Sequence, residues 1–218
     1  MALVDGVGCW RRLPPAPLSF SGRRALFLDR DGVVVSEVGY LGRPEDVALI
    51  DGAGRAIAEL NRAGVPVVLV TNQSGIARGY YDWTAFEAVQ REIERRLGTQ
   101  GAHLDAVLAC GYHAEGLGAL AVDHPWRKPG PGMLLDAAEQ MGVDLASSWI
   151  AGDQARDLQA GRAAGLAGGL HVATGHGDAA QGRAARALAS PAFQVTTATD
   201  LLSGVLALGM TPLGAPSC

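Results

Sequence analysis

Short apolar runs alternate with amphipathic stretches along most of the chain. Runs of strand length predict β-strands at residues 25–28, 66–70, 104–109, 148–151 and 169–173. Apolar residues that recur at helical spacing predict helices at 54–63, 83–97, 132–141 and 155–164. A last strand and a last helix are expected at 193–196 and 201–208. Because strands and helices alternate, we expect an α/β fold with three layers, a Rossmann-like parallel sheet with helices on both faces.

The length of 218 residues suits one domain with short extensions. Residues 1–24 are broken by Gly, Pro and Arg, and we expect an irregular N-terminal extension there. One domain at 25–210 and a C-terminal tail at 211–218 are expected to follow. The stretch 175–190 is rich in Gly, Ala and Arg, so it is either a flexible loop or a poorly packed helix.

Composition narrows the classes of protein. The net charge of -4 gives no indication of a basic surface for nucleic acid. No apolar run approaches the roughly 20 residues that span a bilayer, so no membrane partner is expected. The N-terminus lacks the basic start and apolar stretch of a secretory signal, and the three cysteines lie far apart. We therefore expect a cytoplasmic protein without a disulfide framework, as a monomer or small homo-oligomer.

Candidate chemistry lies where the predicted strands end. Asp29 and Asp31 follow the strand at 25–28, and open α/β folds build their sites at that edge of the sheet. Carboxylates that stand close together repel each other, so a cation is their natural partner. Mg²⁺ prefers oxygen ligands and often bridges to a phosphate. A DxD pair can equally be a solvated turn.

Polar residues follow two further strands. Thr71, Asn72, Gln73 and Ser74 stand at the end of the second strand, where they either donate hydrogen bonds to a phosphoryl oxygen or cap a turn. Asp153 ends the fourth strand. The parallel topology brings all these strand ends to one edge of the sheet, which favours a shared site.

Charged residues outside the strand ends add to this picture. Arg127 and Lys128 precede a proline, and both can bind anions or remain solvated. Asp157, at the start of the helix at 155–164, either interacts favourably with the helix dipole or supports a metal site.

Four motifs together resemble the haloacid dehalogenase (HAD) superfamily of phosphatases. They are DRDG at 29–32, VTNQSG at 70–75, RKP at 127–129 and GDxxxD at 152–157. Within the superfamily, GYLGRPEDV at 39–47, NQSGIARG at 72–79 and RKPGPGM at 127–133 resemble the heptose 1,7-bisphosphate 7-phosphatase group. The histidinol-phosphatase group is its nearest relative.

This resemblance implies roles for the motif residues. Asp29 would be the nucleophile that forms an aspartyl-phosphate, and Asp31 the general acid and base. Thr71 would orient the phosphoryl group with Asn72, and Lys128 would offset its negative charge. Mg²⁺ would be held by Asp29, the backbone carbonyl of Asp31 and Asp153, with Asp157 in support. The residues implied in substrate binding are Glu37, Val38, Gly39, Tyr40, Asn72, Gln73, Ser74 and Arg127.

Two further expectations concern the surroundings of this site. The side chain of Arg30, between the two aspartates, should point away from them if the segment is extended. The intervals from Asp31 to Thr71 and from Thr71 to Lys128 have no room for a large cap domain. An open site suits a small phosphosugar or a phosphate on a larger molecule.

The loop that precedes RKP departs from the pattern of the group, which commonly binds a structural zinc there through C-x-H and C-x-C. This chain offers Cys110, His113 and His124 as tentative zinc ligands, while Trp126 stands at the fourth position. Zinc completed by Asp123 or water, or loss of zinc with Trp126 packing the loop, both remain open.

The remaining histidines show no ligand spacing to one another. We expect His103, His171 and His176 at the surface or at helix edges. No function is assigned to the segment from residue 175 to the C-terminus.

The sequence thus predicts a Mg²⁺-dependent phosphatase that acts on a small phosphorylated sugar, with heptose 1,7-bisphosphate preferred. A histidinol-phosphatase or another small phosphomonoester phosphatase is the alternative. A non-catalytic protein that binds a phospholigand on the same fold is a third reading, because fold does not fix function.

Overall fold

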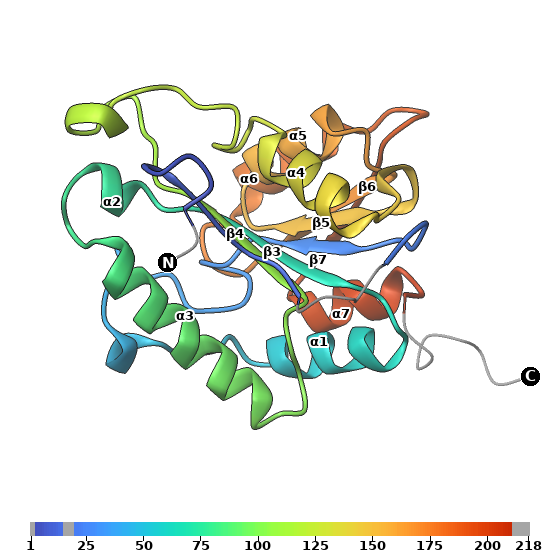
Figure 1. Cartoon of the computed structure of the whole chain (residues 1–218). Helices are drawn as coiled ribbons and strands as arrows, with labels where there is room; N and C mark the ends of the chain where they lie inside the picture. Colours follow the sequence, from blue (N-terminus) through green and yellow to red (C-terminus); the bar gives the residue numbers. More distant parts are fainter. Residues whose placement is uncertain (1–2, 15–19, 211–218) are drawn as a thin grey trace, which may run out of the picture.

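The computed structural model describes residues 3–14 and 20–210, so the expected tail at 211–218 lies outside the described residues. One seven-stranded sheet runs in the order β1-β4-β3-β2-β5-β6-β7 (Figure 1). All neighbours are parallel except β1 and β4, which confirms the predicted α/β fold. The strands are β1 (Cys9–Arg12), β2 (Leu26–Leu28), β3 (Val67–Asn72), β4 (Ala106–Cys110), β5 (Trp149–Gly152), β6 (Gly168–Val172) and β7 (Gln194–Ala198).

The helices cover both faces of the sheet, as Figure 1 shows. On one face lie α1 (Ala53–Arg62), α3 (Trp83–Gly98) and α7 (Leu201–Ala207). On the other lie α4 (Gly132–Met141), α5 (Ala155–Ala163) and α6 (Ala179–Arg186). None of the helices within residues 3–14 and 20–210 has the length and apolar character needed to cross a bilayer.

Strand β2 lies at the centre of the sheet, between β3 and β5. Its side chains alternate between the two cores, because successive residues of a strand point to opposite faces. Leu26 and Leu28 pack under α1 and α3, whereas Phe27 packs under α4 and α5. Apolar residues are therefore needed at every position of β2, which explains its continuous apolar run.

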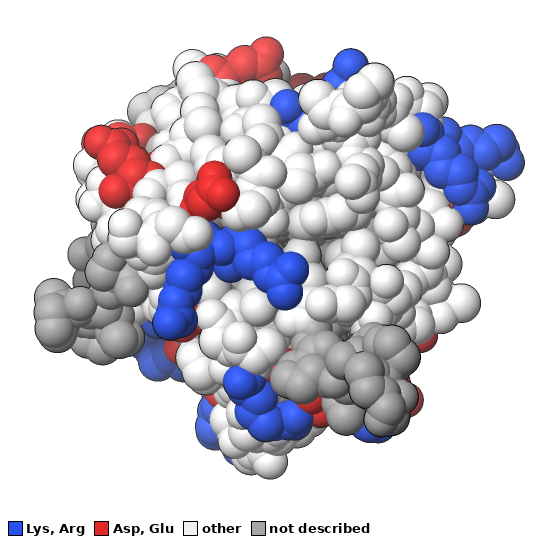
Figure 2. All heavy atoms as spheres, turned by 90° about the vertical axis from the view of Figure 1, so that its right-hand side faces the viewer, with Lys and Arg blue, Asp and Glu red and all other residues white. Residues whose placement is uncertain are grey.

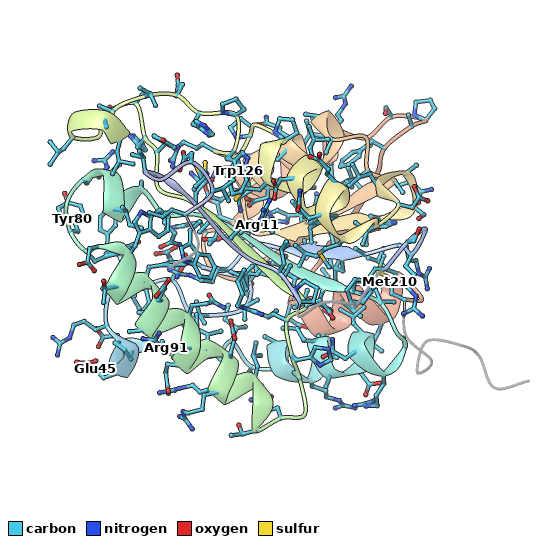
Figure 3. All side chains as sticks on the ribbon, in the orientation of Figure 1. Arg11, Glu45, Tyr80, Arg91, Trp126 and Met210 are labelled. Carbon is cyan, nitrogen blue, oxygen red and sulfur yellow. The ribbon has the colours of Figure 1, made fainter. Side chains whose placement is uncertain are left out.

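The N-terminal extension is more regular than expected. The prediction of irregular structure for residues 1–24 is wrong at Cys9–Arg12, which form β1 along the edge of the sheet. Arg11 reaches from β1 to Asp136 on α4 with a 2.6 Å contact, and it is labelled in Figure 3. The two adjacent arginines conceal the strand pattern, and edge strands commonly carry such charges.

The structure contains two helices that the sequence did not clearly predict. One was an alternative to a flexible loop, and the other was not expected. Within 175–190, α6 forms because Asp178 caps it by accepting hydrogen bonds from the backbone N–H groups of Ala180 and Gln181. A short helix, α2 (Ser74–Ala77), follows β3 directly. In the described chain, the segment between β2 and β3 holds one 3-10 turn (Pro44–Asp46) and α1, and no cap domain is inserted there.

Charge is distributed unevenly over the surface. On the face shown in Figure 2, arginine side chains form several separate groups among mostly uncharged residues, and acidic groups lie between and around them. The described atoms of this face therefore present no continuous basic surface of the kind that binds nucleic acid.

Candidate active site

The carboxyl ends of β2, β3 and β5 border a cavity of about 230 Å³. The backbone N–H of Asp29 donates to the carbonyl of Ala151 at 3.0 Å, which fixes Asp29 directly beyond the end of β2. The cavity is lined by Asp29, Asp31, Glu37, Gly39, Tyr40, Asn72, Ser74, Gln154, Arg156 and His176.

Lys128, the only lysine in the sequence, lies buried beneath this cavity. Its Nζ contacts Oδ1 of Asp29 at 2.7 Å and Oδ1 of Asp157 at 2.8 Å, and it donates to the carbonyl of Val70 at 2.9 Å. Burial opposes its charge, but the Asp157 and Asp29 carboxylates outweigh that effect and raise the pKa of Lys128 above its ordinary value. The site therefore holds a permanent cation against Asp29.

The loop that carries Lys128 is tied to the end of β3 by Asn72. The side-chain Nδ2 of Asn72 donates to the carbonyl of Lys128, and Oδ1 of Asn72 accepts from the Lys128 N–H, both at 3.0 Å. This two-way contact fixes the position of the Lys128 backbone relative to the sheet edge. Asn72 also lines the cavity.

Asp29, Asp153 and Asp157 form a group that we call the strand-edge carboxylates, with one oxygen from each within 4.8 Å of the others. Oδ2 of Asp153 accepts a 2.8 Å hydrogen bond from the N–H of His176, while its buried Oδ1 has no hydrogen-bond partner among the described residues. Burial, with the charge of Asp29 as the next cause, raises the pKa of Asp153 to about 7. This set of oxygens, one of them unpartnered, fits a hard divalent cation.

Two glycines allow the loops to approach Asp153 closely. A Cβ on Gly32 would lie 2.2 Å from Oδ2 of Asp153, and a Cβ on Gly175 would lie 2.4 Å from Cα of Gly32. Both glycines have positive φ, which other residues adopt only with strain. The geometry around Asp153 thus depends on the absence of side chains at both positions.

Asp157 interacts with the start of α5, which is one of the two roles that the sequence left open, and it also binds Lys128. Its Oδ2 accepts a 3.1 Å hydrogen bond from the N–H of Gln154 and so caps α5, while Oδ1 pairs with Lys128. Burial is the main cause that raises the pKa of Asp157, and the charge of Lys128 acts against it.

Asp31 is held by a network that runs through Arg30 and Gln73. Arg30 donates from Nε and Nη2 to the Asp31 carboxylate at 3.0–3.2 Å, and Nε2 of Gln73 donates to Oδ2 of Asp31 at 3.2 Å. The expectation that Arg30 points away from the aspartates is wrong. The chain turns after Asp29, since the N–H groups of Val34 and Val35 both donate to the carbonyl of Arg30, and the segment is not extended.

Comparison with known proteins places this site in a family. A family model described as "HAD-hyrolase-like" matches residues 125–201. A Mesorhizobium japonicum protein named D-glycero-beta-D-manno-heptose-1,7-bisphosphate 7-phosphatase is 52% identical over 149 residues, which are 68% of this chain and 69% of that protein. The chain belongs to the HAD superfamily of phosphatases. The enzyme is therefore a phosphoric monoester hydrolase.

Other relatives agree. A Rhodopseudomonas palustris protein of the same name is 45% identical over 147 residues, covering 67% of this chain and 82% of its own. A Mesorhizobium loti structure described as a HAD-like phosphatase covers 100% of both chains with a TM-score of 0.85 and 40% identity. The D,D-heptose 1,7-bisphosphate phosphatase of B. bronchiseptica, solved with magnesium and phosphate, has a TM-score of 0.72 and 34% identity, covering 85% of this chain and 97% of that one.

Several of the predicted catalytic and substrate-binding residues do not line this cavity. Thr71 and Gln73 are buried behind Asp31, where Nε2 of Gln73 also donates to Oγ1 of Thr71 at 2.7 Å. Val38 is exposed and does not line the cavity. Arg127 borders a neighbouring cleft and donates to the carbonyl of Tyr112 at 3.2 Å. Expected residues that do line the cavity are Glu37, Gly39, Tyr40, Asn72 and Ser74.

The structure adds three residues to the cavity that the sequence reasoning missed, namely Gln154, Arg156 and His176. The first two lie within the GDxxxD motif, between Asp153 and Asp157, so the sequence could have predicted that they lie near the site. His176 is exposed, as expected, and its Nε2 lies 3.7 Å from Oε2 of Glu37 at the rim of the cavity. The expectation of a surface position is wrong for His171, which is buried in β6, where burial lowers its pKa.

The tentative zinc ligands do not come together as expected. Nε2 of His113 lies 3.5 Å from Nη2 of Arg78, and its Nδ1 accepts from the N–H of Glu115. The ring of Tyr112 instead stacks on His124, with centroids 4.5 Å apart. In the C-x-H pattern the histidine stands two residues after the cysteine, a position that Tyr112 occupies here, and His113 follows one residue later.

A different group forms in the phosphatase near that loop. Asp5, Cys9 and His124, which we call the N-terminal cluster, place one ligand atom each within 4.8 Å of the others. Oδ1 of Asp5 accepts from three backbone N–H groups at 3.0 Å, and Oδ2 accepts from the Tyr112 hydroxyl at 2.7 Å. These bonds outweigh the effect of burial and hold the pKa of Asp5 well below its usual range. Burial raises the pKa of the Cys9 thiol.

Trp126, labelled in Figure 3, completes the packing of the loop. Its indole packs against the apolar core under α4 and α5, and the backbone N–H of Trp126 donates to Nδ1 of His124 at 3.2 Å. The N-terminal segment and the loop are thus joined by contacts between protein groups.

Proposed function

We propose that this phosphatase hydrolyses D-glycero-D-manno-heptose 1,7-bisphosphate at its 7-phosphate, with Mg²⁺ and an aspartyl-phosphate on Asp29. The names of its relatives supply the substrate, since proteins with up to 52% identity are named for that reaction. The observation that carries the chemistry is the contact of Asp29 with the buried Lys128 beside an unpartnered oxygen of Asp153.

Asp29, Asp153 and the backbone carbonyl of Asp31 would hold the Mg²⁺ ion. When bound, the ion supplies positive charge that offsets the negative charge of the nucleophile and of the phosphoryl oxygens. The raised pKa of Asp153 supports this assignment, because a group of crowded carboxylates is stabilised by a cation.

In the first step, a carboxylate oxygen of Asp29 attacks phosphorus, and the bond between phosphorus and the sugar oxygen breaks. Asp31, protonated at this stage, donates its proton to the leaving oxygen. Lys128 holds Asp29 in position and offsets charge on the transferring group. Phosphoryl transfer depends mainly on positioning and charge stabilisation, which this arrangement provides.

In the second step, Asp31 removes a proton from water, and the water oxygen attacks the phosphorus of the aspartyl-phosphate. The bond between phosphorus and Asp29 breaks, inorganic phosphate leaves, and both aspartates return to their starting states. Arg30 and Gln73, which bind the Asp31 carboxylate, keep it in one orientation through both steps. The open cavity leaves room for water to enter.

The test is phosphate release with Mg²⁺ from both anomers of the heptose 1,7-bisphosphate, fructose 1,6-bisphosphate and histidinol phosphate. We expect a kcat/KM at least about tenfold higher for one heptose anomer, and an activity loss of more than about 1,000-fold in Asp29→Asn. Equal activity across the panel would refute the heptose assignment and keep the phosphatase. No release from any substrate, with unchanged binding in Asp29→Asn, would instead indicate a phospholigand-binding protein.

A further inference from the structure

Among the residues that the structure describes, Arg156 has no hydrogen-bond or ion-pair partner that explains its position. It is the second residue of α5 and lines the cavity next to Gln154. Its Nε is buried without a hydrogen-bond partner, and no ion pair of Arg156 occurs within the described residues. A buried donor without a partner costs about 1–3 kcal/mol, so an arginine in this state points to a ligand.

Helix stability does not account for Arg156 either. A cation in the first turn of a helix interacts unfavourably with the helix dipole. The nearest carboxylate along the chain, Asp157, is already bound to Lys128 and to the N–H of Gln154. The guanidinium therefore remains available for an anion from outside the chain.

A second arginine lies close to the first. The half-buried Arg127 makes one hydrogen bond, to the carbonyl of Tyr112, and borders the cleft beside Lys128. Burial is the main cause that lowers the pKa of Arg127, and the charge of Arg156 is the next. Two half-buried like charges within electrostatic reach of each other are stabilised when an anion joins them.

The cavity is lined by several acidic side chains and by one arginine. Among the described residues that line it, Arg156 is the only one with a permanent positive charge, whereas Asp29, Asp31 and Glu37 are acidic. The strand-edge carboxylates with their cation and Lys128 suffice for one phosphoryl group. Arg156 is not needed there, and its planar guanidinium suits bidentate binding of a second phosphate.

We propose that Arg156 binds the phosphate of the substrate that is not transferred and thereby selects bisphosphates over monophosphates. This inference rests on the proposed function, because it requires a substrate with two phosphates. It assigns a specificity-determining role to a residue between the two aspartates of the GDxxxD motif, at a position that the motif itself leaves undefined.

The test compares Arg156→Gln and Arg156→Lys with the wild type on the heptose 1,7-bisphosphate and on the corresponding heptose 7-phosphate. We expect Arg156→Gln to lower kcat/KM for the bisphosphate by about 10- to 100-fold, mainly through KM, and to change the value for the monophosphate less than about twofold. Arg156→Lys should recover part of the loss, because lysine restores the positive charge but lacks the planar guanidinium that binds a phosphate through two hydrogen bonds. Arg162→Gln, on the exposed face of the same helix, is the matched control.

An equal loss on both substrates, or no loss on either, would overturn the proposal. p-Nitrophenyl phosphate, which offers only the transferred group, checks that the variants keep their active site. If the wild type prefers another bisphosphate and that preference depends on Arg156, the heptose assignment fails and the Arg156 assignment stands. If the wild type hydrolyses monophosphates as efficiently as bisphosphates, the Arg156 assignment fails whatever the substrate.

Discussion

The strand-edge carboxylates and the N-terminal cluster both gather side chains that bind metals, but they differ in how far the protein satisfies them. Asp153 keeps a buried oxygen without a partner, and its pKa is raised to about 7. Asp5 accepts four hydrogen bonds, which hold its pKa below its usual range. The first group leaves a carboxylate oxygen available for a cation, as the proposed function requires, whereas the carboxylate of the second is held by the chain itself. Both groups contain residue types that bind metals, and they differ in how many of their oxygens already accept hydrogen bonds.

The largest expected effect comes from removing the buried side chain of Lys128, which pairs with two of the strand-edge carboxylates. Lys128→Ala leaves Asp29 and Asp157 buried without their partner, so we expect the free energy of unfolding to fall by about 3–5 kcal/mol and kcat by about 1,000-fold or more. Denaturant unfolding and phosphate release measure the two effects.

Arg11→Ala is the control for Lys128→Ala, since it breaks a more exposed ion pair with Asp136. We expect it to cost less than about 1 kcal/mol and to leave kcat unchanged. Similar losses of stability in both variants would contradict the view that Lys128 is the central electrostatic partner of the site.

The close packing of the Gly175 backbone against Asp153 gives a second test of the site. Gly175→Ala combines positive φ with a Cβ 2.5 Å from Oδ2 of Asp153, so we expect a stability loss of about 1–3 kcal/mol and a fall in activity of about tenfold or more. Gly165→Ala also has positive φ but meets no atom within 4 Å, so it should lose stability only. Equal activity in the two variants would show that the approach to Asp153 does not matter for catalysis.

The pKa of Asp153 predicts how Mg²⁺ binding depends on pH. Below pH about 7 the metal-free site holds a proton on Asp153, and a cation must displace it. Affinity for Mg²⁺ should therefore fall by up to about tenfold for each unit of pH below 7 and level off above it. Calorimetric titration with Mg²⁺ from pH about 5.5 to 8.5 measures this slope, and a flat profile would contradict the assignment.

The same shift has a consequence for stability. Because the folded state holds the Asp153 proton more tightly than the unfolded state, metal-free protein should lose stability as pH rises from about 4 to about 7. Saturating Mg²⁺ should reduce that loss, because it stabilises the ionised carboxylate. Thermal unfolding with and without Mg²⁺ across this range checks the prediction.

The smallest expected effect belongs to the N-terminal cluster. Tyr112→Phe removes one hydrogen bond to Asp5, so we expect a loss of about 1 kcal/mol in stability and a kcat within about twofold of the wild type. Tyr80→Phe, with an exposed ring, should change neither quantity. A large loss of activity in Tyr112→Phe would show that the two groups are coupled.

The sequence predicted the central sheet because its strands are continuous apolar runs and their polar ends meet at one edge. It did not predict β1, whose adjacent arginines Arg11 and Arg12 hide the strand pattern. An edge strand is defined by its pairing with β4, which is a contact between distant residues that no local pattern records.

The motifs likewise located the site, but they did not show which side chains line the cavity and which lie behind it. Gln73 was expected at the substrate and is instead buried behind Asp31, because a motif gives the strand end but not the direction of each side chain. Arg156 and His176 enter the cavity through the starts of α5 and of the loop after β6, which only the folded chain brings together. His113, which stands one residue later than the C-x-H pattern requires, lies beside Arg78.

The most direct test of the account is to trap the phosphoryl group on Asp29. Asp31→Asn lacks the base for the second step, whereas p-nitrophenyl phosphate has a leaving group that needs little protonation in the first. Acid quenching, digestion and mass spectrometry should then find one added phosphoryl group on the peptide that contains Asp29, and none in the Asp29→Asn/Asp31→Asn double variant. A phosphoryl group on another residue, or an Asp29→Asn enzyme that keeps the wild-type rate, would contradict the account.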